Sequence, residues 1–419
     1  MSGPLKGTVR PPSDKSLTHR SYIFSAFART PSTIINPLRG EDCNATLEIM
    51  RQIGARAEVH ELPDTTKVFP IKELVSPSAP LECGNSGTTM RLLCGVLAAQ
   101  EGLSAMLVGD ASLSRRPMKR VTDPLRMMGA NIEGDTAPIT IKGGALHGID
   151  YTSPVASAQI KSCVLLAGLF ASGRTCVTEP ETSRDHTERM LRSLKVPINV
   201  DGNTACVEGG QKWDGFTFEA PADISSAAFL LCAAAIVPGS HVVLRGVGAN
   251  PTRTGVIDAL RAAGAILEES PKDEQMGEPV SDYAVTHTPG LRAFEIGGAL
   301  VPRLIDEIPV LAVLATQCDG TTKIRDAKEL RVKESDRIDA VAGGLRAMGA
   351  EVETTEDGMD VHGPVQLKGA TIDAEGDHRI GMAFAVAGLA AQGETTILNA
   401  DSIQTSYPQF VSDVRSLQA

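Results

Sequence analysis

Residues 13–28 read SDKSLTHRSYIFSAFA, a charged and hydroxyl-rich start followed by an apolar, alanine-rich run. A polar turn, a cap and an apolar run are typical of the start of a buried helix. The plan recurs at roughly 65 to 80 residues, a longer period than that of short solenoid repeats. The five further copies are GNSGTTMRLLCGVLAA (84–99), VASAQIKSCVLLAGLFA (155–171), PADISSAAFLLCAAAIV (221–237), PRLIDEIPVLAVLAT (302–316) and GDHRIGMAFAVAGLAA (376–391).

A second element follows each copy, and in five of them it has the pattern helix, small turn, strand. Examples are DALRAAGAILE (258–268) and GGLRAMGAEVE (343–353). In four of the five, Gly stands where a helix C-cap takes a left-handed residue, and Lys195-Val196-Pro197 replaces it in the third. Short β-rich stretches such as Ser104–Val108 lie between the two helices. Each repeat therefore predicts two helices and several strands, an α/β unit.

Six repeats divide naturally into two domains of three. The sixth second element, PQFVSDVRSLQA (408–419), ends the chain before any strand, whereas residues 5–10 form a spare extended segment before the first helix. We therefore expect the N-terminal strand to join the C-terminal domain. The predicted lobes are 13–220 and 1–12 with 221–419. They would be joined by a double crossover, a hinge beside a cleft.

Composition limits the partners. The chain has 419 residues, a net charge of -11 and 4% aromatic residues, which disfavours nucleic acid and anionic membranes. The sequence shows no long apolar run, signal peptide or zinc-ligand spacing. None of the eight cysteines forms a C-x-x-C pair, so we expect buried, reduced thiols in a cytoplasmic protein.

Two polar clusters suggest chemistry: KSLTHR (15–20) and RVKESDR (331–337). Cations and hydroxyls at helix N-termini suit a small anion that carries phosphate and carboxylate. The structural alternatives are helix capping by Ser13, Asp14, Asn85 and Ser157, a solvated ion pair at Glu334, an N-cap at Asp306 and a surface charge at Arg379. Capping does not explain why Lys15, Arg20, Arg91 and Lys161 interrupt apolar helices.

Eight motifs together resemble the 5-enolpyruvylshikimate-3-phosphate synthase family over nearly the full length. They are, in family order, PSDKSLTHR, GNSGTTMRLL, SRRPMKRV, SAQIKS, SRDHTERML, DEIPVLA, RVKESDRI and GDHRIGMA. The resemblance implies a two-domain inside-out α/β barrel of six βαβαββ repeats, three per domain. It also implies transfer of the enolpyruvyl group of phosphoenolpyruvate to the 5-hydroxyl of shikimate 3-phosphate. This is a shikimate-pathway step that needs no cofactor or metal, and we expect a monomer.

The resemblance also implies site residues. For shikimate 3-phosphate they are Lys15, Ser16, Arg20, Ser157, Ala158, Gln159, Ser183, Asp306 and Lys333. For phosphoenolpyruvate they are Lys15, Asn85, Gly87, Arg116, Gln159, Arg337 and Arg379. Some relatives have Ser, Asn and Lys where this chain has Ala158, Glu329 and Gln404. In this family, glyphosate occupies the phosphoenolpyruvate site beside the glycine that corresponds to Gly87. The structural alternative is that Gly87 is a turn residue that needs positive φ.

The reaction delivers one proton to a methylene carbon and removes another from an alcohol, work that two carboxylates can divide. We assign Glu334 as the acid and Asp306 as the base, with Lys15 as a third catalytic group. Two rivals remain open. One is an enolpyruvyltransferase acting on UDP-N-acetylglucosamine, which has Asn after the Lys where this chain has Ser16. The other is a non-catalytic two-lobe protein that binds a phosphorylated metabolite.

Overall fold

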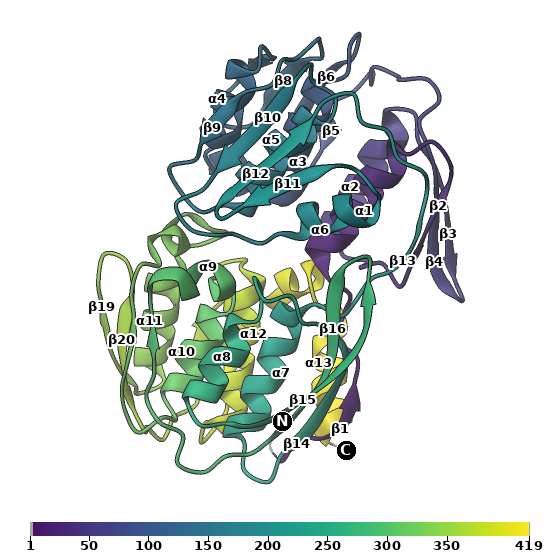
Figure 1. Cartoon of the computed structure of the whole chain (residues 1–419). Helices are drawn as coiled ribbons and strands as arrows, with labels where there is room; N and C mark the ends of the chain where they lie inside the picture. Colours follow the sequence, from purple (N-terminus) through teal and green to yellow (C-terminus); the bar gives the residue numbers. More distant parts are fainter. Residues whose placement is uncertain (1–2, 419) are drawn as a thin grey trace. The chain divides into compact units, whose positions relative to one another are not determined.

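The computed structural model describes residues 3–418 (Figure 1). Contacts divide the chain into two units. We call Ser13–Ala220 together with Glu274–Glu278 the N-terminal unit. The C-terminal unit comprises the chain up to Pro12, Pro221–Asp273 and the chain from Pro279 onward. No helix within residues 3–418 is long and apolar enough to cross a membrane.

In the N-terminal unit, three four-stranded sheets of the described chain repeat one strand order: β13-β2-β4-β3, β5-β6-β8-β7 and β9-β10-β12-β11. The first pair of each sheet is parallel and the other pairs are antiparallel. The strands are β2 (Ser32–Ile35), β3 (Arg56–Glu61), β4 (Asp64–Phe69), β5 (Leu81–Glu82), β6 (Ser104–Val108), β7 (Asn131–Glu133), β8 (Ile139–Lys142), β9 (Asp150–Thr152), β10 (Arg174–Thr178), β11 (Ile198–Asp201), β12 (Thr204–Glu208) and β13 (Thr217–Glu219).

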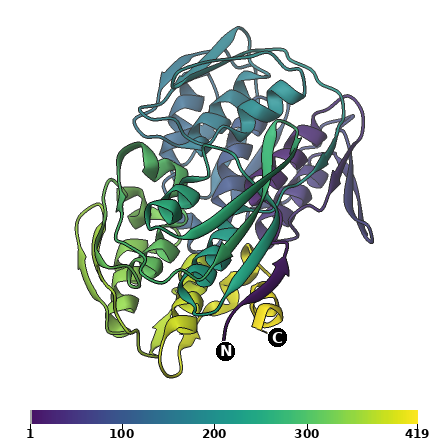
Figure 2. The ribbon, with the colours of Figure 1, turned by 60° about the horizontal axis from the view of Figure 1, so that its bottom comes forward.

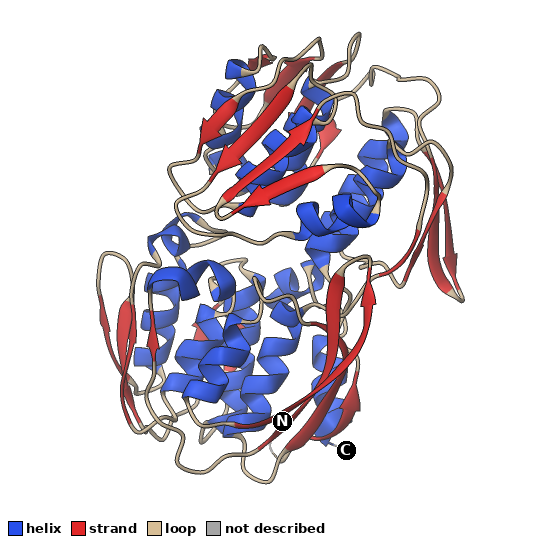
Figure 3. Ribbon diagram, in the orientation of Figure 1, coloured by secondary structure: helices blue, strands red, loops and turns tan. Residues whose placement is uncertain are grey.

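Helices fill the inside of this unit, and the strands lie on their outer side (Figure 3). The helices are α1 (Lys15–Ala26), α2 (Glu41–Gln52), α3 (Gly87–Ala98), α4 (Lys119–Met127), α5 (Ala158–Gly168) and α6 (His186–Ser193). Helices α3 and α5 pack closely at Gly95, where an added Cβ would lie 2.2 Å from the carbonyl oxygen of Cys163. The apolar first helix of each repeat is therefore buried, as its sequence predicts.

The C-terminal unit repeats the plan with sheets β1-β14-β16-β15 and β17-β18-β20-β19 and the two-stranded sheet β21-β22. The strands are β1 (Lys6–Val9), β14 (His241–Gly248), β15 (Ile266–Gln275), β16 (Glu278–Thr286), β17 (Glu295–Ile296), β18 (Gly320–Ile324), β19 (Glu351–Thr354), β20 (Met359–Gly363), β21 (Thr371–Asp373) and β22 (Thr396–Leu398). The helices are α7 (Ile224–Ile236), α8 (Gly255–Ala262), α9 (Val301–Leu304), α10 (Ile308–Ala315), α11 (Arg337–Ala347), α12 (His378–Ala390) and α13 (Phe410–Gln418). Helices α7, α10 and α12 contact one another in its core.

Two strands are exchanged between repeats. Elsewhere the strand before a repeat's first helix pairs in parallel with the strand after it, as β5 does with β6. In contrast, β1 precedes α1 but pairs with β14, and β13 precedes α7 but pairs with β2. The spare N-terminal segment thus completes the sheet of the fourth repeat, whereas the sixth repeat keeps two strands. Helix α13 packs on β1 instead (Figure 2).

The predicted helix C-caps are confirmed. Gly54, Gly129, Gly264 and Gly349 have φ of +118°, +92°, +83° and +90°. Lys195, which replaces glycine in the third repeat, has φ of +60°. The same backbone turn is therefore kept at that position by a side chain for which it is less favourable.

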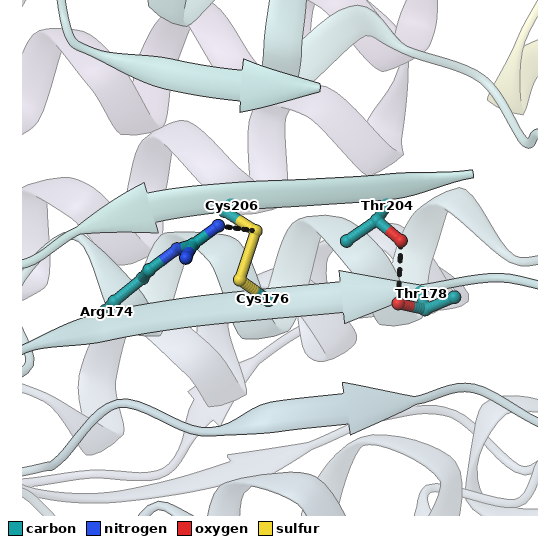
Figure 4. The surroundings of a disulfide bond; sticks show 5 residues. All are labelled: Arg174, Cys176, Thr178, Thr204 and Cys206. Atoms are coloured by element: carbon teal, nitrogen blue, oxygen red, sulfur yellow. Dashed lines mark hydrogen bonds between the residues drawn. A yellow bond between two sulfur atoms is a disulfide. The ribbon is translucent and has the colours of Figure 1, made fainter. Parts of the chain in front are cut away.

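The expectation of eight reduced cysteines is wrong for one pair. Cys176 on β10 and Cys206 on β12 form a disulfide, which bridges directly opposed positions of antiparallel strands (Figure 4). The bond is possible because the paired backbones bring the two Cα atoms to 4.1 Å. The other six cysteines are free and buried, and burial raises the pKa of Cys94 and Cys318 to about 12.

Two adjacent glycines of α11 give opposite predictions. An added Cβ at Gly344 would lie 2.1 Å from the ring of Phe384, which is buried, whereas Gly343 faces open space. We expect Gly344→Ala to lower the free energy of unfolding by about 1–3 kcal/mol through overpacking. Gly343→Ala should raise it by about 0.5–1 kcal/mol through helix propensity. Denaturant unfolding of the two variants would contradict this account if both changes had the same sign.

Candidate active site

Lys15 opens α1 in the N-terminal unit. The carboxylate of Asp14 caps the helix by accepting a hydrogen bond from the N–H of Leu17 at 2.8 Å. The Lys15 Nζ lies 3.0 Å from Asp42 Oδ2, in the first turn of α2. The Lys15 side chain keeps 17% of its surface exposed. The ammonium group is therefore anchored by Asp42, and the side chain as a whole is only partly buried.

Arg20 is buried and ties three helices together. Its guanidinium donates hydrogen bonds to Thr187 Oγ1 at 2.8 Å, Ser162 Oγ at 2.7 Å and the Ser16 carbonyl at 2.9 Å. Burial lowers the pKa of Arg20 to about 10, although Glu188 and Asp14 act in the opposite direction. The group remains a cation near neutral pH, with hydroxyls as its neighbours.

The start of α3 brings three predicted residues together. Arg116 donates to Asn85 Oδ1 at 2.6 Å and to the Asn85 carbonyl at 3.1 Å. A Cβ added to Gly87 would lie 2.8 Å from Arg91 Nη1 and 3.4 Å from Arg116 Nη1. Gly87 is the first residue of α3 and is not among the glycines with positive φ, so the turn explanation for this glycine is wrong. The helix N-cap is Ser86, not Asn85.

Arg91 was not among the predicted site residues. Its Nη1 donates to Gln159 Oε1 at 2.6 Å, and Gln159 Nε2 donates to Thr88 Oγ1 at 3.0 Å. The predicted residue Gln159 is therefore joined to the start of α3 through Arg91 and Thr88. The signal in the sequence was a cation one helical turn after Gly87 in an otherwise apolar run.

Ser157 and Ser183 share one carboxylate. The Ser157 N–H donates to Glu179 Oε1 and the Ser183 hydroxyl to Glu179 Oε2, both at 2.8 Å.

Lys161 lies 2.9 Å from Glu179 and 2.8 Å from Glu188. Burial alone would lower the pKa of Lys161, but these carboxylates raise it. Lys161 interrupts its apolar helix because it pairs with two buried carboxylates, a reason that helix capping does not supply. Ala158, the first residue of α5, follows Ser157.

In the C-terminal unit, Arg337 forms ion pairs with three carboxylates. Its Nε lies 2.8 Å from Asp377, its Nη2 lies 2.6 Å from Glu334 and its Nη1 lies 3.2 Å from Asp306. The Arg337 side chain is 1% exposed. Burial would lower the pKa of Arg337, but the three carboxylates raise it. All three guanidinium nitrogens of Arg337 therefore face carboxylates.

Asp306 also meets the other predicted cations. Lys333 Nζ lies 3.6 Å and Arg379 Nη2 lies 3.7 Å from its carboxylate, and Arg379 donates to its backbone carbonyl at 3.0 Å. The structural alternatives are wrong: Glu307 occupies the N-cap of α10, and Arg379 is buried. Glu334 does pair with Arg337, but its partner is buried and shared, not solvated. All five predicted C-terminal site residues thus form one cluster.

Asp377 is a further residue that the sequence analysis missed. It caps α12 by accepting from the N–H of Arg379 at 2.9 Å, and it is fully buried. Burial raises the pKa of Asp377, but the adjacent Arg337 outweighs it, so the net shift is downward. An Asp directly before an apolar helix in GDHRIGMA was the available signal.

Comparison with known proteins decides the family. The model for EPSP synthase (3-phosphoshikimate 1-carboxyvinyltransferase) matches residues 1–414. The chain belongs to the EPSP synthase family. It is 48% identical to 3-phosphoshikimate 1-carboxyvinyltransferase from Bacillus cereus, over 99% of this chain and 97% of that one. It is 50% identical to the same enzyme from Brevibacillus brevis, over 97% of this chain and 96% of that one.

A solved structure of EPSP synthase from Acinetobacter baumannii matches this fold with a TM-score of 0.89 and 42% identity. The match covers 100% of this chain and 97% of the other. The two-domain inside-out α/β fold and the transferase class predicted from the sequence are confirmed. The UDP-N-acetylglucosamine enzyme and the non-catalytic binder are not favoured.

The lowered pKa of Asp377 gives a testable pH dependence. Its contribution to stability is complete above the unfolded-state pKa of about 4 and is lost as pH falls through the lower folded value. Asp377→Asn retains a good N-cap but removes one charge from Arg337. We expect it to lower the free energy of unfolding by about 3 kcal/mol at pH 7, with the difference shrinking below about pH 4.

Denaturant unfolding between pH 7 and pH 3 measures this difference, with the exposed Glu268→Gln as a surface control. A penalty for Asp377→Asn that stays constant over the whole range would show that the carboxylate charge contributes nothing.

Proposed function

We propose that this chain transfers the enolpyruvyl group of phosphoenolpyruvate to the 5-hydroxyl of shikimate 3-phosphate and releases phosphate. The observation that carries the proposal is the pair of carboxylates, Asp306 and Glu334, fixed by one buried guanidinium beside Lys333 and Arg379. Two anchored acids next to cations suit a reaction that moves two protons on an anionic substrate. Membership of the EPSP synthase family supports the same reaction.

Proton transfer follows from the two acids. In the addition step, Glu334 protonates the methylene carbon of phosphoenolpyruvate, and the 5-hydroxyl oxygen bonds to C2 as its proton passes to Asp306. In the elimination step, the new methyl group returns a proton to Glu334 as the double bond re-forms, the C–O bond to phosphate breaks, and the leaving phosphate takes the proton held by Asp306. The surrounding cations stabilise the charge that develops at the substrate.

The N-terminal unit supplies further binding groups in this proposal. Lys15 contacts both substrates and takes part in catalysis. The groups that bind shikimate 3-phosphate are Ser16, Arg20, Ser157, Ala158, Gln159 and Ser183, together with Asp306 and Lys333 of the C-terminal unit. The groups that bind phosphoenolpyruvate are Asn85, Gly87, Arg116 and Gln159, together with Arg379. Arg91 joins this second set because of its hydrogen bond to Gln159. For Arg337, which the family resemblance assigns to phosphoenolpyruvate, we propose instead the role of fixing Asp306 and Glu334, because its guanidinium pairs with both carboxylates.

We further propose that the enzyme works as a cytoplasmic monomer, with domains 13–220 and 1–12 with 221–419 that move about a hinge. Neither nucleic acid, membrane, metal nor cofactor is expected to take part. The net charge of -11 supports the exclusion of polyanionic partners.

Phosphate release from phosphoenolpyruvate tests the reaction. It should depend on shikimate 3-phosphate and produce one equivalent of the enolpyruvyl product per phosphate. Release that needs UDP-N-acetylglucosamine instead, or binding without turnover, would overturn the proposal in favour of one of the two rivals.

The roles of the two acids make a direct prediction. Glu334→Gln and Asp306→Asn keep the side-chain shapes but remove the proton donor and acceptor. We expect each to lower kcat by at least about a hundredfold, the usual scale for loss of a general acid or base. Steady-state kinetics with a melting curve for each folded variant is the measurement. Near-normal turnover would remove that residue from the mechanism.

Gly87 makes a prediction about inhibition. We expect glyphosate to compete with phosphoenolpyruvate, and Gly87→Ala to weaken glyphosate more than phosphoenolpyruvate. The added methyl group would displace the guanidinium group of Arg91 and lie against that of Arg116, and the longer ligand has less room to adjust. Overpacking of this kind costs about 1–3 kcal/mol. Inhibition constants and melting temperatures decide it, and an equal loss for both ligands would contradict the steric explanation.

A further inference from the structure

Glu179 joins two segments that are separate in sequence. It directly follows β10, and its side chain is 1% exposed. Its Oε1 accepts the N–H of Ser157 at the start of α5. Its Oε2 accepts both the hydroxyl of Ser183 at 2.8 Å and the N–H of Ser183 at 3.4 Å. One carboxylate therefore fixes two backbone segments relative to each other.

Lys161 completes the fixation of Ser183. Its ammonium group lies 2.9 Å from Glu179 and donates to the Ser183 carbonyl at 3.4 Å. The hydroxyl, N–H and carbonyl of Ser183 are thus all held by this ion pair. Glu188 lies 2.8 Å from Lys161 and is its second carboxylate partner.

We propose that Glu179 is the positioning residue for the two serines that bind the phosphate of shikimate 3-phosphate. This inference rests on the proposed function, which places Ser157 and Ser183 on that phosphate. A carboxylate repels phosphate and cannot itself bind it, so Glu179 acts through the serines. When phosphate binds, the Ser183 hydroxyl turns from Glu179 to donate to it, while the N–H contacts of both serines keep the segments in place.

The chain offers a matched pair of variants. Glu179→Gln and Glu188→Gln each remove one buried carboxylate from Lys161, from side chains that are 1% and 3% exposed. Both should lower the melting temperature by a similar amount, since each removes one of the two carboxylates that stabilise the buried ammonium group of Lys161. Glu179→Gln alone disturbs the serines, because its amide nitrogen cannot accept hydrogen bonds.

We expect Glu179→Gln to raise the KM for shikimate 3-phosphate about tenfold, the effect of about 1.4 kcal/mol. The KM for phosphoenolpyruvate and kcat should change less than about threefold, and Glu188→Gln should leave both KM values within about twofold of wild type. Equal changes of the KM for shikimate 3-phosphate in the two variants would show that Glu179 only stabilises the fold, and would overturn the proposal. An unchanged KM for shikimate 3-phosphate in Glu179→Gln would also overturn the proposal.

Glu179→Asp keeps the charge for Lys161 but is one methylene too short to reach both serines. A cavity of about 70 Å³ bordered by Lys161, Glu179 and Glu188 can admit water beside the shortened chain. If Glu179→Gln does not fold, Glu179→Asp should still weaken calorimetric binding of shikimate 3-phosphate about tenfold, and wild-type affinity would overturn the proposal. Absence of binding by the wild-type protein would instead refute the proposed function.

Discussion

A charge buried at the start of an apolar helix needs a partner, and this constraint organises both units. Arg337 holds Asp306, Glu334 and Asp377 in the C-terminal unit. Lys161 holds Glu179 and Glu188 in the N-terminal unit. Breaking such a pair by removing one partner costs about 3–5 kcal/mol, because the remaining charge stays buried. The same pairs fix the directions of the side chains assigned to binding and catalysis.

The two clusters are arranged by the same repeated topology. The C-terminal cluster gathers residues at the starts of α10, α11 and α12, and the N-terminal cluster includes residues of α5 and α6. The first helices of the repeats pack together in the core of each unit. The cap residues Asp14, Ser86, Asp223 and Asp377 each accept a backbone N–H at the start of such a helix. Polar groups from different repeats therefore gather at the helix starts without disturbing the apolar packing behind them.

The sequence was informative where a local rule decides the structure. The alternation of apolar helices with short strands predicted the repeats, and glycine at C-cap positions predicted the left-handed turns. Motif resemblance predicted which charged residues cluster, and the structure brings Asp306, Lys333, Glu334, Arg337 and Arg379 together. It also brings Asn85 to Arg116.

Pairing partners could not be predicted in the same way. Whether Lys161 faces a ligand or two carboxylates depends on where Glu179 and Glu188 lie, and both are distant in sequence. The disulfide between Cys176 and Cys206 depends on the register of β10 with β12. The same holds for two of the three carboxylates of Arg337, because Asp306 and Asp377 are distant from it in sequence. Long-range contacts, not local propensity, decide each of these cases.

The proposed mechanism depends on Arg337 fixing Asp306 and Glu334, the two carboxylates assigned to proton transfer, and not on direct binding of phosphoenolpyruvate by Arg337. Arg337→Lys keeps one positive charge but cannot span three carboxylates. The decisive measurement is kcat together with the dissociation constant for phosphoenolpyruvate in the presence of shikimate 3-phosphate. We predict that kcat falls at least about a hundredfold while the dissociation constant changes less than about threefold. A dissociation constant that rises a hundredfold with kcat preserved would contradict the account.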